Sequence, residues 1–258
     1  MATAQRHGPL SLFRAKLGGL VSGLADTVFP PVCAGCGILT GRHRGVCGAC
    51  WSSITLIERP YCEVLGLPFS HDLGAGFLCA DAIANPPVFD RLRSVAVHDG
   101  VARNLVHGLK YRDRTDLAAM MAEWMLRASD GRVADCDALI PVPLHAFRLL
   151  ARRFNQSAEL ARAVARLSGK PYLADALLRT KRTRRQVGLG VRAREDNVRS
   201  AFSVSSPHRA DLAGARVVLV DDVYTTGATV SAATRALKRA GVVDVTVLTF
   251  ARALSAPI

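Results

Sequence analysis

Short apolar runs alternate with amphipathic stretches over the last two thirds of the chain. An unbroken apolar run is typical of a strand buried on both faces of a sheet. Such runs lie near residues 94–98, 138–142, 216–220 and 243–250, and a hairpin is expected near 202–204. Apolar residues at helical spacing lie near residues 101–109, 116–128, 155–168 and 229–240. This alternation predicts an α/β fold with a mainly parallel sheet and helices on both faces.

The first third of the chain has a different composition, and Pro86 and Pro87 mark the change. We therefore expect three parts in the chain. They are an N-terminal amphipathic helix within residues 1–30, a small cysteine-rich domain in residues 31–86 and the α/β domain in residues 87–258.

The expected N-terminal helix has apolar residues at helical spacing. They are Leu10, Phe13, Leu17, Leu20, Leu24 and Val28. Arg14 and Lys16 interrupt what would otherwise resemble a signal-peptide core, and no apolar run approaches the roughly 18 to 20 residues that span a bilayer. We therefore expect a cytoplasmic protein without a membrane span. The helix is expected to pack on the protein's own body, with membrane-surface binding as the alternative.

The chain is strongly basic, because 34 Lys and Arg against 21 Asp and Glu give a net charge of +13. Such a charge favours polyanionic partners such as nucleic acid or pyrophosphate-bearing ligands, and a merely soluble basic protein is the alternative. Basic residues concentrate in one segment, which is expected to be mobile and to face anions. They are Arg179, Lys181, Arg182, Arg184, Arg185, Arg192, Arg194 and Arg199, opposed there only by Glu195 and Asp196.

Four of the seven cysteines form two C-x2-C pairs separated by ten residues: Cys33, Cys36, Cys47 and Cys50. Each pair aims two thiolates at one point, and two pairs make the closed tetrahedral set that structural zinc prefers. Disulfides are the alternative, but a reducing compartment disfavours them and no secretion signal is evident. A catalytic zinc is disfavoured because four cysteines leave no open coordination position. The spacing therefore predicts one structural zinc.

Cys62 and Cys79 do not form a second set of pairs, because Leu65 and Ala82 stand at the positions that would complete them. We expect no second zinc there. His71 lies between the two cysteines and is expected to be a surface histidine rather than a further ligand.

The stretch VVLVDDVYTTGAT, residues 217–229, predicts a buried strand, a tight loop and the start of a helix. Asp221 and Asp222 follow the apolar run, and the carboxyl ends of strands line the ligand crevice in open parallel sheets. The small residues after them lead into a helix whose first amides can hold a phosphate. These residues are Thr225, Thr226, Gly227, Ala228 and Thr229. We therefore expect a ribose 5-phosphate, its hydroxyls on the acids and its phosphate in the loop. An ordinary turn with an acidic cap is the alternative.

This stretch closely resembles the phosphoribosyl-diphosphate (PRPP) binding signature of type I phosphoribosyltransferases. Three further stretches extend the resemblance: GLKYRDR (108–114), PVPLHAFRLLARRFNQS (141–157) and RTKRTRRQVGLGVRAREDN (179–197). With the cysteine-rich head, they make nearly the whole chain similar to the ComF family. Its members are phosphoribosyltransferase-like proteins with an N-terminal zinc ribbon, associated with uptake of transforming DNA. Many members have a second complete cysteine set, and a glycine where this chain has Arg153.

The resemblance implies a type I phosphoribosyltransferase-like sheet and a role for each matching residue. Asp221 and Asp222 would contact the ribose hydroxyls, and the loop of residues 225–229 would hold the 5-phosphate. Lys110 would meet the pyrophosphate together with Mg²⁺, and a flexible lid would add Arg182, Arg184 and Arg185. An exposed helix-end lysine and a solvated or nucleic-acid-binding charge run are the alternatives for these cations.

Two functions follow from this resemblance. The first is a Mg²⁺-dependent phosphoribosyltransferase that displaces pyrophosphate from PRPP through an oxocarbenium-like transition state, for an acceptor that the sequence does not identify. The second is a non-catalytic protein that holds PRPP or single-stranded DNA, with the zinc ribbon docking DNA-processing proteins. Aromatic residues make up only 6% of the chain, which argues against a platform that stacks bases. The sequence favours PRPP recognition more than turnover.

Overall fold

The computed structural model describes residues 30–41, 43, 45–74, 76–111, 114–144, 154–180 and 201–254. The expected helix at residues 10–28 and the lid arginines lie outside these ranges. Across the described parts, none of the helices has both the length and the apolar character needed to cross a bilayer.

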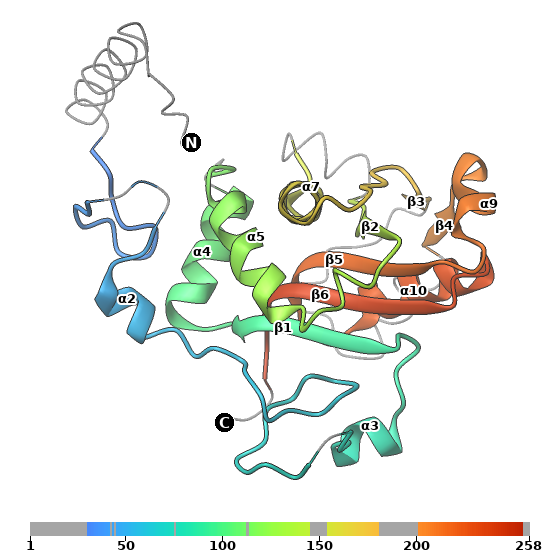
Figure 1. Ribbon diagram of the computed structural model, residues 1–258. Coiled ribbons are helices and arrows are strands. Elements are labelled where there is room, and N and C mark those ends of the chain that lie inside the picture. Colours follow the sequence, from blue (N-terminus) through green and yellow to red (C-terminus); the bar gives the residue numbers. More distant parts are fainter. Residues whose placement is uncertain are drawn as a thin grey trace, which may run out of the picture.

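The centre of the molecule is a parallel sheet of four strands in the order β1-β6-β5-β2 (Figure 1). The strands are β1 (Arg91–Val97), β2 (Ala138–Pro141), β5 (Arg216–Tyr224) and β6 (Asp244–Arg252). Each of them overlaps one of the apolar runs that predicted a strand. The predicted parallel α/β sheet is confirmed.

Helices cover both faces of this sheet (Figure 1). On one face lie α4 (Gly100–Tyr111), α5 (Leu117–Ala128) and α7 (Gln156–Ser168), and on the other lies α10 (Ala228–Arg239). The side chains of successive residues in β5 point to opposite faces of the sheet, as strand geometry requires. Val218 and Val220 pack in the core beneath α4, α5 and α7, whereas Val217 and Leu219 pack beneath α10. The unbroken apolar run thus results from a strand covered on both sides.

Short elements complete the α10 face. Strands β3 (Leu177–Arg179) and β4 (Phe202–Val204) form a separate antiparallel pair, followed by η1 (Ser206–His208) and α9 (Arg209–Leu212). The predicted hairpin near 202–204 therefore has its partner on the far side of the arginine-rich segment.

Helix α7 begins and ends at residues suited to those positions. The side chain of Asn155 accepts a hydrogen bond from the Ser157 amide at 3.1 Å, which is the cap that its place before the helix predicts. Gly169 ends the helix with a φ of 70°, a left-handed conformation that glycine adopts without steric cost. The cap fixes Ser157 in the first turn of α7, beside the carboxyl end of β5.

Strand β5 is longer than its apolar run indicates. It continues through Asp221 and Asp222 to Tyr224, and its last residue pairs with Arg252 of β6. On its other side, β2 stops at Pro141, opposite Val220. The two acids were expected just beyond the strand, but they lie within it. The long neighbour β6 extends the ladder past the last apolar residue.

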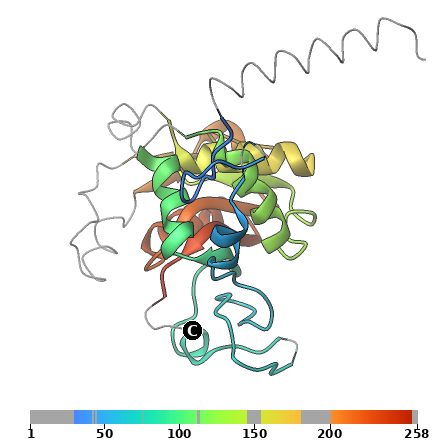
Figure 2. The same cartoon turned by 90° about the vertical axis from the view of Figure 1, so that its left-hand side faces the viewer.

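The cysteine-rich region lies along the outer edge of β1 and extends beyond the sheet (Figure 2). Its two short helices are α2 (Gly48–Ser52) and α3 (Ala80–Ala84). Between them, the amide of Ile57 donates to the Val95 carbonyl at 2.9 Å, and the amide of Val97 donates to the Thr55 carbonyl at 2.9 Å. This segment therefore adds antiparallel hydrogen bonds to an otherwise free strand edge.

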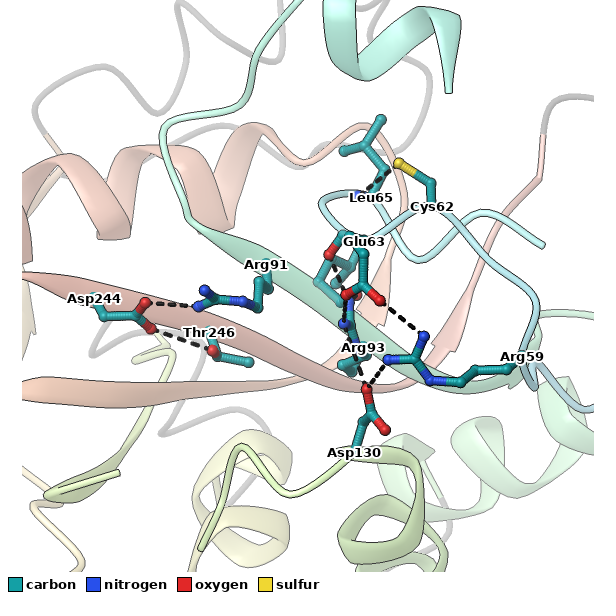
Figure 3. A network of polar contacts seen from close by, with 10 residues as sticks. Arg59, Cys62, Glu63, Leu65, Arg91, Arg93, Asp130, Asp244 and Thr246 are labelled. Carbon is teal, nitrogen blue, oxygen red and sulfur yellow. Dashed lines mark hydrogen bonds and ion pairs between the residues drawn. The ribbon is translucent and has the colours of Figure 1, made fainter. Parts of the chain in front are cut away.

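A buried arginine joins this region to the sheet (Figure 3). Arg93 of β1 is only 1% exposed and donates to the backbone carbonyl of Glu63 at 2.9 Å and to its carboxylate at 2.8 Å. Its guanidinium lies 4.7 Å from the ring centre of Tyr61. A buried charge needs partners of this kind. The contacts hold the second half of the cysteine-rich region against β1.

Candidate functional site

The carboxyl end of β5 brings an acid pair and a lysine together, and we call this site the crevice, after the ligand crevice of open parallel sheets. Lys110, in the last turn of α4, places its Nζ 2.9 Å from Oδ2 of Asp222. The Asp222 side chain is 10% exposed and that of Lys110 is 23% exposed. Two distant segments of the chain therefore meet at the position that the sequence predicted for a ribose phosphate.

Asp221 makes different contacts from Asp222. Its Oδ1 accepts hydrogen bonds from the Ser157 hydroxyl at 2.7 Å and from the Asp222 amide at 2.9 Å. Burial and then the neighbouring Asp222 charge raise the pKa of Asp221 to about 7. Near neutral pH this carboxyl holds a proton part of the time, so it can donate as well as accept a hydrogen bond.

His98 lies close to the same charges, one residue beyond β1. Its amide donates to the Arg252 carbonyl at 2.7 Å. Burial and the charge of Lys110 lower the pKa of His98, against the opposing effect of Asp222. A neutral imidazole is therefore favoured at this edge of the crevice.

The loop after β5 has the geometry of an anion-binding turn. Gly227 has a φ of 76° and occupies the N-cap position of α10, so the residue at that position has no side chain with which to cap the helix. The amides at a helix N-terminus point toward a ligand and favour negative charge. All five predicted loop residues, 225–229, lie at the junction of β5 and α10.

Alanine at Gly227 is expected to damage this loop. Its Cβ would lie 2.5 Å from the hydroxyl oxygen of Tyr224, and the positive φ is unfavourable for any residue with a Cβ. We expect a loss of about 1–3 kcal/mol in unfolding free energy, measured by chemical denaturation, together with weaker PRPP binding. Gly214→Ala is the matched control, because Gly214 has a φ of 78° and nothing within 4 Å of its added Cβ. Equal PRPP affinity in the two variants would show that the loop does not touch the ligand.

The other predicted cations fall outside the described residues. These are the lid arginines Arg182, Arg184 and Arg185. Lys110 is thus the predicted phosphate-binding cation that the structure places in the crevice.

The four cysteines of the two C-x2-C pairs converge on one point. The sulfur atoms of Cys33, Cys36, Cys47 and Cys50 all lie within 4.8 Å of one another. Backbone amides support the cluster, since Cys47 donates to the Cys33 sulfur at 3.1 Å and Cys50 donates to the Cys47 sulfur at 3.4 Å. A closed set of four thiolates suits a structural zinc ion and leaves no position for a substrate.

The electrostatics and packing of this cluster also suit a metal. Burial alone would raise the pKa of Cys33, but amides from Cys47, Cys36 and Gly35 outweigh it and lower the pKa to about 6. Burial raises the pKa of the Cys50 thiol well above its usual range, so a cation is needed to keep this thiolate charged. A Cβ at Gly35 would lie 2.9 Å from the Cys50 sulfur, so the close approach requires glycine here.

A second turn repeats the geometry of the first without its full ligand set. The Gly66 amide donates to the Cys62 carbonyl at 2.7 Å, as the Gly37 amide donates to the Cys33 carbonyl at 2.9 Å. The Cys79 amide donates to the Cys62 sulfur at 3.3 Å. Leu65 and Ala82 are each 5% exposed and stand at the two remaining ligand positions. Within the described ranges, the four-cysteine cluster is the one group of metal-ligating side chains found. The absence of a second zinc remains a prediction.

Two residues of the crevice were missed by reasoning from the sequence. Ser157 lies within the quoted stretch 141–157, but its contact with Asp221 depends on how α7 approaches β5. His98 follows the first strand of the sheet, and the end of a parallel strand is a signal that could have identified it.

Comparison with known families and proteins agrees with this two-part architecture. The profile of the double zinc ribbon domain matches residues 24–83, and that of the phosphoribosyl transferase domain matches residues 157–257. DNA utilization protein YhgH of Escherichia coli (strain K12) is 32% identical over 218 residues, covering 82% of this chain and 92% of that protein. Competence protein F of Haemophilus influenzae is 28% identical over 81% of this chain and 91% of that protein. Competence protein ComFC of Bacillus subtilis is 25% identical over 76% of this chain and 79% of that protein.

Among solved structures, the glutamine phosphoribosylpyrophosphate (PRPP) amidotransferase from B. subtilis, complexed with ADP and GMP, overlaps with a TM-score of 0.33 and 24% identity. The overlap covers 55% of this chain and 30% of that one.

Proposed function

Because the chain belongs to the ComF family, which joins a zinc ribbon to a phosphoribosyltransferase domain, we propose that it binds PRPP at the carboxyl end of β5. We further propose that it acts in the uptake or use of DNA, as the names of its relatives indicate for those proteins. The four zinc-binding thiolates have to stay reduced, which is consistent with a cytoplasmic location.

One observation supports the PRPP site most directly: the Asp222–Lys110 ion pair forms at the end of β5 that leads, through Gly227, into the N-terminus of α10. PRPP contains the complementary groups, since its ribose hydroxyls suit carboxylates and its 5-phosphate suits the amides of α10. A lysine 2.9 Å from the acid is within reach of the pyrophosphate on the same sugar. The acids and the phosphate loop therefore match different ends of one ligand.

The proposed ligand changes the partners of Lys110. In the structure, its ammonium pairs with Asp222. When PRPP enters, the ammonium would move toward the pyrophosphate, and Asp222 would accept from a ribose hydroxyl instead. Mg²⁺ bound with PRPP would neutralise further charge on the leaving group. Such electrostatic stabilisation is what departure of pyrophosphate from the anomeric carbon requires, and no protein nucleophile is needed.

A non-catalytic role is the second candidate, and the net charge of +13 favours it. A protein of this charge would attract DNA, and the same crevice could hold PRPP as a regulatory ligand without turnover. The zinc ribbon would then serve to dock DNA-processing proteins.

The test of the proposed site is a calorimetric titration with PRPP and Mg²⁺ of wild type, Lys110→Met and Lys238→Met. Lys238 is the matched control, because it also pairs with an aspartate, Asp90, at 2.7 Å. A charged hydrogen bond contributes about 1.5–3 kcal/mol, so Lys110→Met is expected to weaken binding about tenfold or more. Lys238→Met should bind as wild type does.

Lack of PRPP binding by wild type, or equal loss in both variants, would contradict the proposal. If PRPP binds, release of pyrophosphate with a panel of nucleobase and amine acceptors then separates the enzyme from the binding protein.

A further inference from the structure

A cleft lies between the cysteine-rich region and α5, and none of its lining residues belongs to the proposed PRPP site. Its volume is about 210 Å³. It is lined by Trp51, Leu56, Ile57, Tyr61, Val95 and Trp124. Its charged lining residues, which we call the rim, are Glu58, Arg59, Arg127 and Asp130. The cleft exists because residues 55–57 pair with β1 and bring α2 close to α5.

The walls of the cleft contain both tryptophans of the chain. The rings of Trp51 and Trp124 meet edge to face, with centroids 4.9 Å apart and planes at 74°. Phe250, fully buried in β6, stacks on Trp124 at 5.9 Å and holds that ring in place. Trp51 remains 38% exposed. The low aromatic content argued against base stacking, but the fold brings both tryptophans and Tyr61 together at this cleft.

The charges at the rim are of two kinds. Arg59 is held by Asp130 at 2.6 Å and by Glu63 at 2.8 Å, as Figure 3 shows. Arg127 and Glu58 are exposed, and neither has an ion-pair partner among the residues that the structure describes. The rim therefore offers one unpaired cation and one unpaired hydrogen-bond acceptor beside an aromatic corner.

These features define the occupant. Pockets that enclose a whole drug-sized ligand measure roughly 300–1,000 Å³, so this smaller cleft suits a single ring with its substituents outside. Two perpendicular indoles suit a flat aromatic ring, which would stack on one and meet the edge of the other. Arg127 suits a phosphate, and Glu58 suits an exocyclic amino group.

We propose that this cleft binds one unpaired, amino-bearing nucleobase whose phosphate lies at Arg127. The base comes either from a free nucleotide or from a single DNA strand. This site is separate from the proposed PRPP site, so either ligand could bind even if the other did not.

Intrinsic fluorescence reports on this cleft specifically, because both tryptophans of the chain line it. The full zinc-loaded chain is titrated with deoxycytidine 5′-monophosphate, a ten-residue oligodeoxycytidine and a DNA duplex. Quenching that saturates is expected with a single-stranded probe and not with the duplex. Saturation by the mononucleotide indicates a free nucleotide, and saturation by the oligonucleotide alone indicates a strand. The Asp221→Asn, Asp222→Asn double variant should quench as wild type does, whether or not it binds PRPP.

Two variants test the assignment of residues. Stacking on an aromatic side chain contributes roughly 1–3 kcal/mol per base, so Trp51→Ala should weaken binding about tenfold, whereas Trp51→Phe should retain most of it. Zinc content is measured in both variants, because Trp51 follows a zinc ligand. Arg127→Gln should weaken binding and lower the slope of log affinity against log salt by about one. Its control is Arg239→Gln, an exposed arginine in the last turn of α10, as Arg127 is in α5.

The proposal is overturned if neither single-stranded probe quenches the fluorescence. It is also overturned if zinc-loaded Trp51→Ala binds as tightly as wild type by anisotropy of a labelled oligonucleotide, or if Arg127→Gln and Arg239→Gln behave alike.

Discussion

Asparagine at both Asp221 and Asp222 is expected to weaken PRPP binding at least a hundredfold without unfolding the protein. In the proposed complex, each carboxylate accepts a hydrogen bond from the ribose, and a hydrogen bond to a charged group contributes about 1.5–3 kcal/mol. Asparagine offers only a neutral acceptor at each position, and weakening both bonds by about 1.5 kcal/mol accounts for a factor of a hundred or more. The measurement is calorimetric titration with PRPP and Mg²⁺, as for Lys110→Met.

The single change Asp221→Asn is expected to stabilise the protein above neutral pH. An ordinary aspartate has a pKa of 3.8, whereas the pKa of Asp221 is about 7 in the folded chain. Between these values the folded state holds a proton that the unfolded state has released, so wild-type stability falls as pH rises through this window and is constant above it. The shift corresponds to at most about 4 kcal/mol. Asparagine removes the charge and can still accept from Ser157 and from the Asp222 amide.

Thermal melting of wild type and Asp221→Asn at pH 5 and pH 8 measures this effect. The variant should gain most at pH 8. A gain of equal size at both pH values would mean that burial of charge is not the cause.

For the double variant, PRPP binding as tight as that of wild type would exclude the acid pair from the site.

Loss of zinc is expected to unfold the four-cysteine cluster. Structural zinc binds peptides with about 10–16 kcal/mol, and burial raises the pKa of the Cys50 thiol, so its thiolate depends on the charge of the metal. Cys36→Ser is the sharpest variant, because Cys36 is exposed and its replacement costs little packing. We expect one zinc per wild-type chain by metal analysis, none in Cys36→Ser, and a lower melting temperature in that variant.

Cys79→Ser is the control for this experiment. The Cys79 amide donates to the Cys62 sulfur of the second turn, where Leu65 and Ala82 stand at the two remaining ligand positions. This variant should retain one zinc. Two zinc ions per wild-type chain, or full zinc content in Cys36→Ser, would contradict the assignment.

Local patterns predicted the parts of the structure that depend on neighbours in sequence. The C-x2-C spacing specified the cluster because each turn positions its own two thiols. The apolar runs specified the strands because burial on both faces leaves a continuous signal.

The parts that sequence reasoning missed depend on packing between distant segments. The extension of β5 through Asp221 and Asp222 depends on the length of β6, which lies after it in the chain. The contact between Ser157 and Asp221 depends on the approach of α7. The aromatic cleft depends on the pairing of residues 55–57 with β1, which no local pattern of the tryptophans could reveal.

The hydrogen bonds between residues 55–57 and β1 also protect the protein from self-association. An uncovered outer strand presents a row of unpaired amides and carbonyls, which can recruit a strand from another molecule. Here the amide of Leu92 donates to Val64, and residues 55–57 occupy the groups farther along β1. The segment on the N-terminal side of residue 86 thus shields the sheet from intermolecular strand addition. The proposed boundary at residues 86 and 87 is a change in composition. Cutting the chain there would leave the edge of β1 uncovered and able to pair with strands of other molecules.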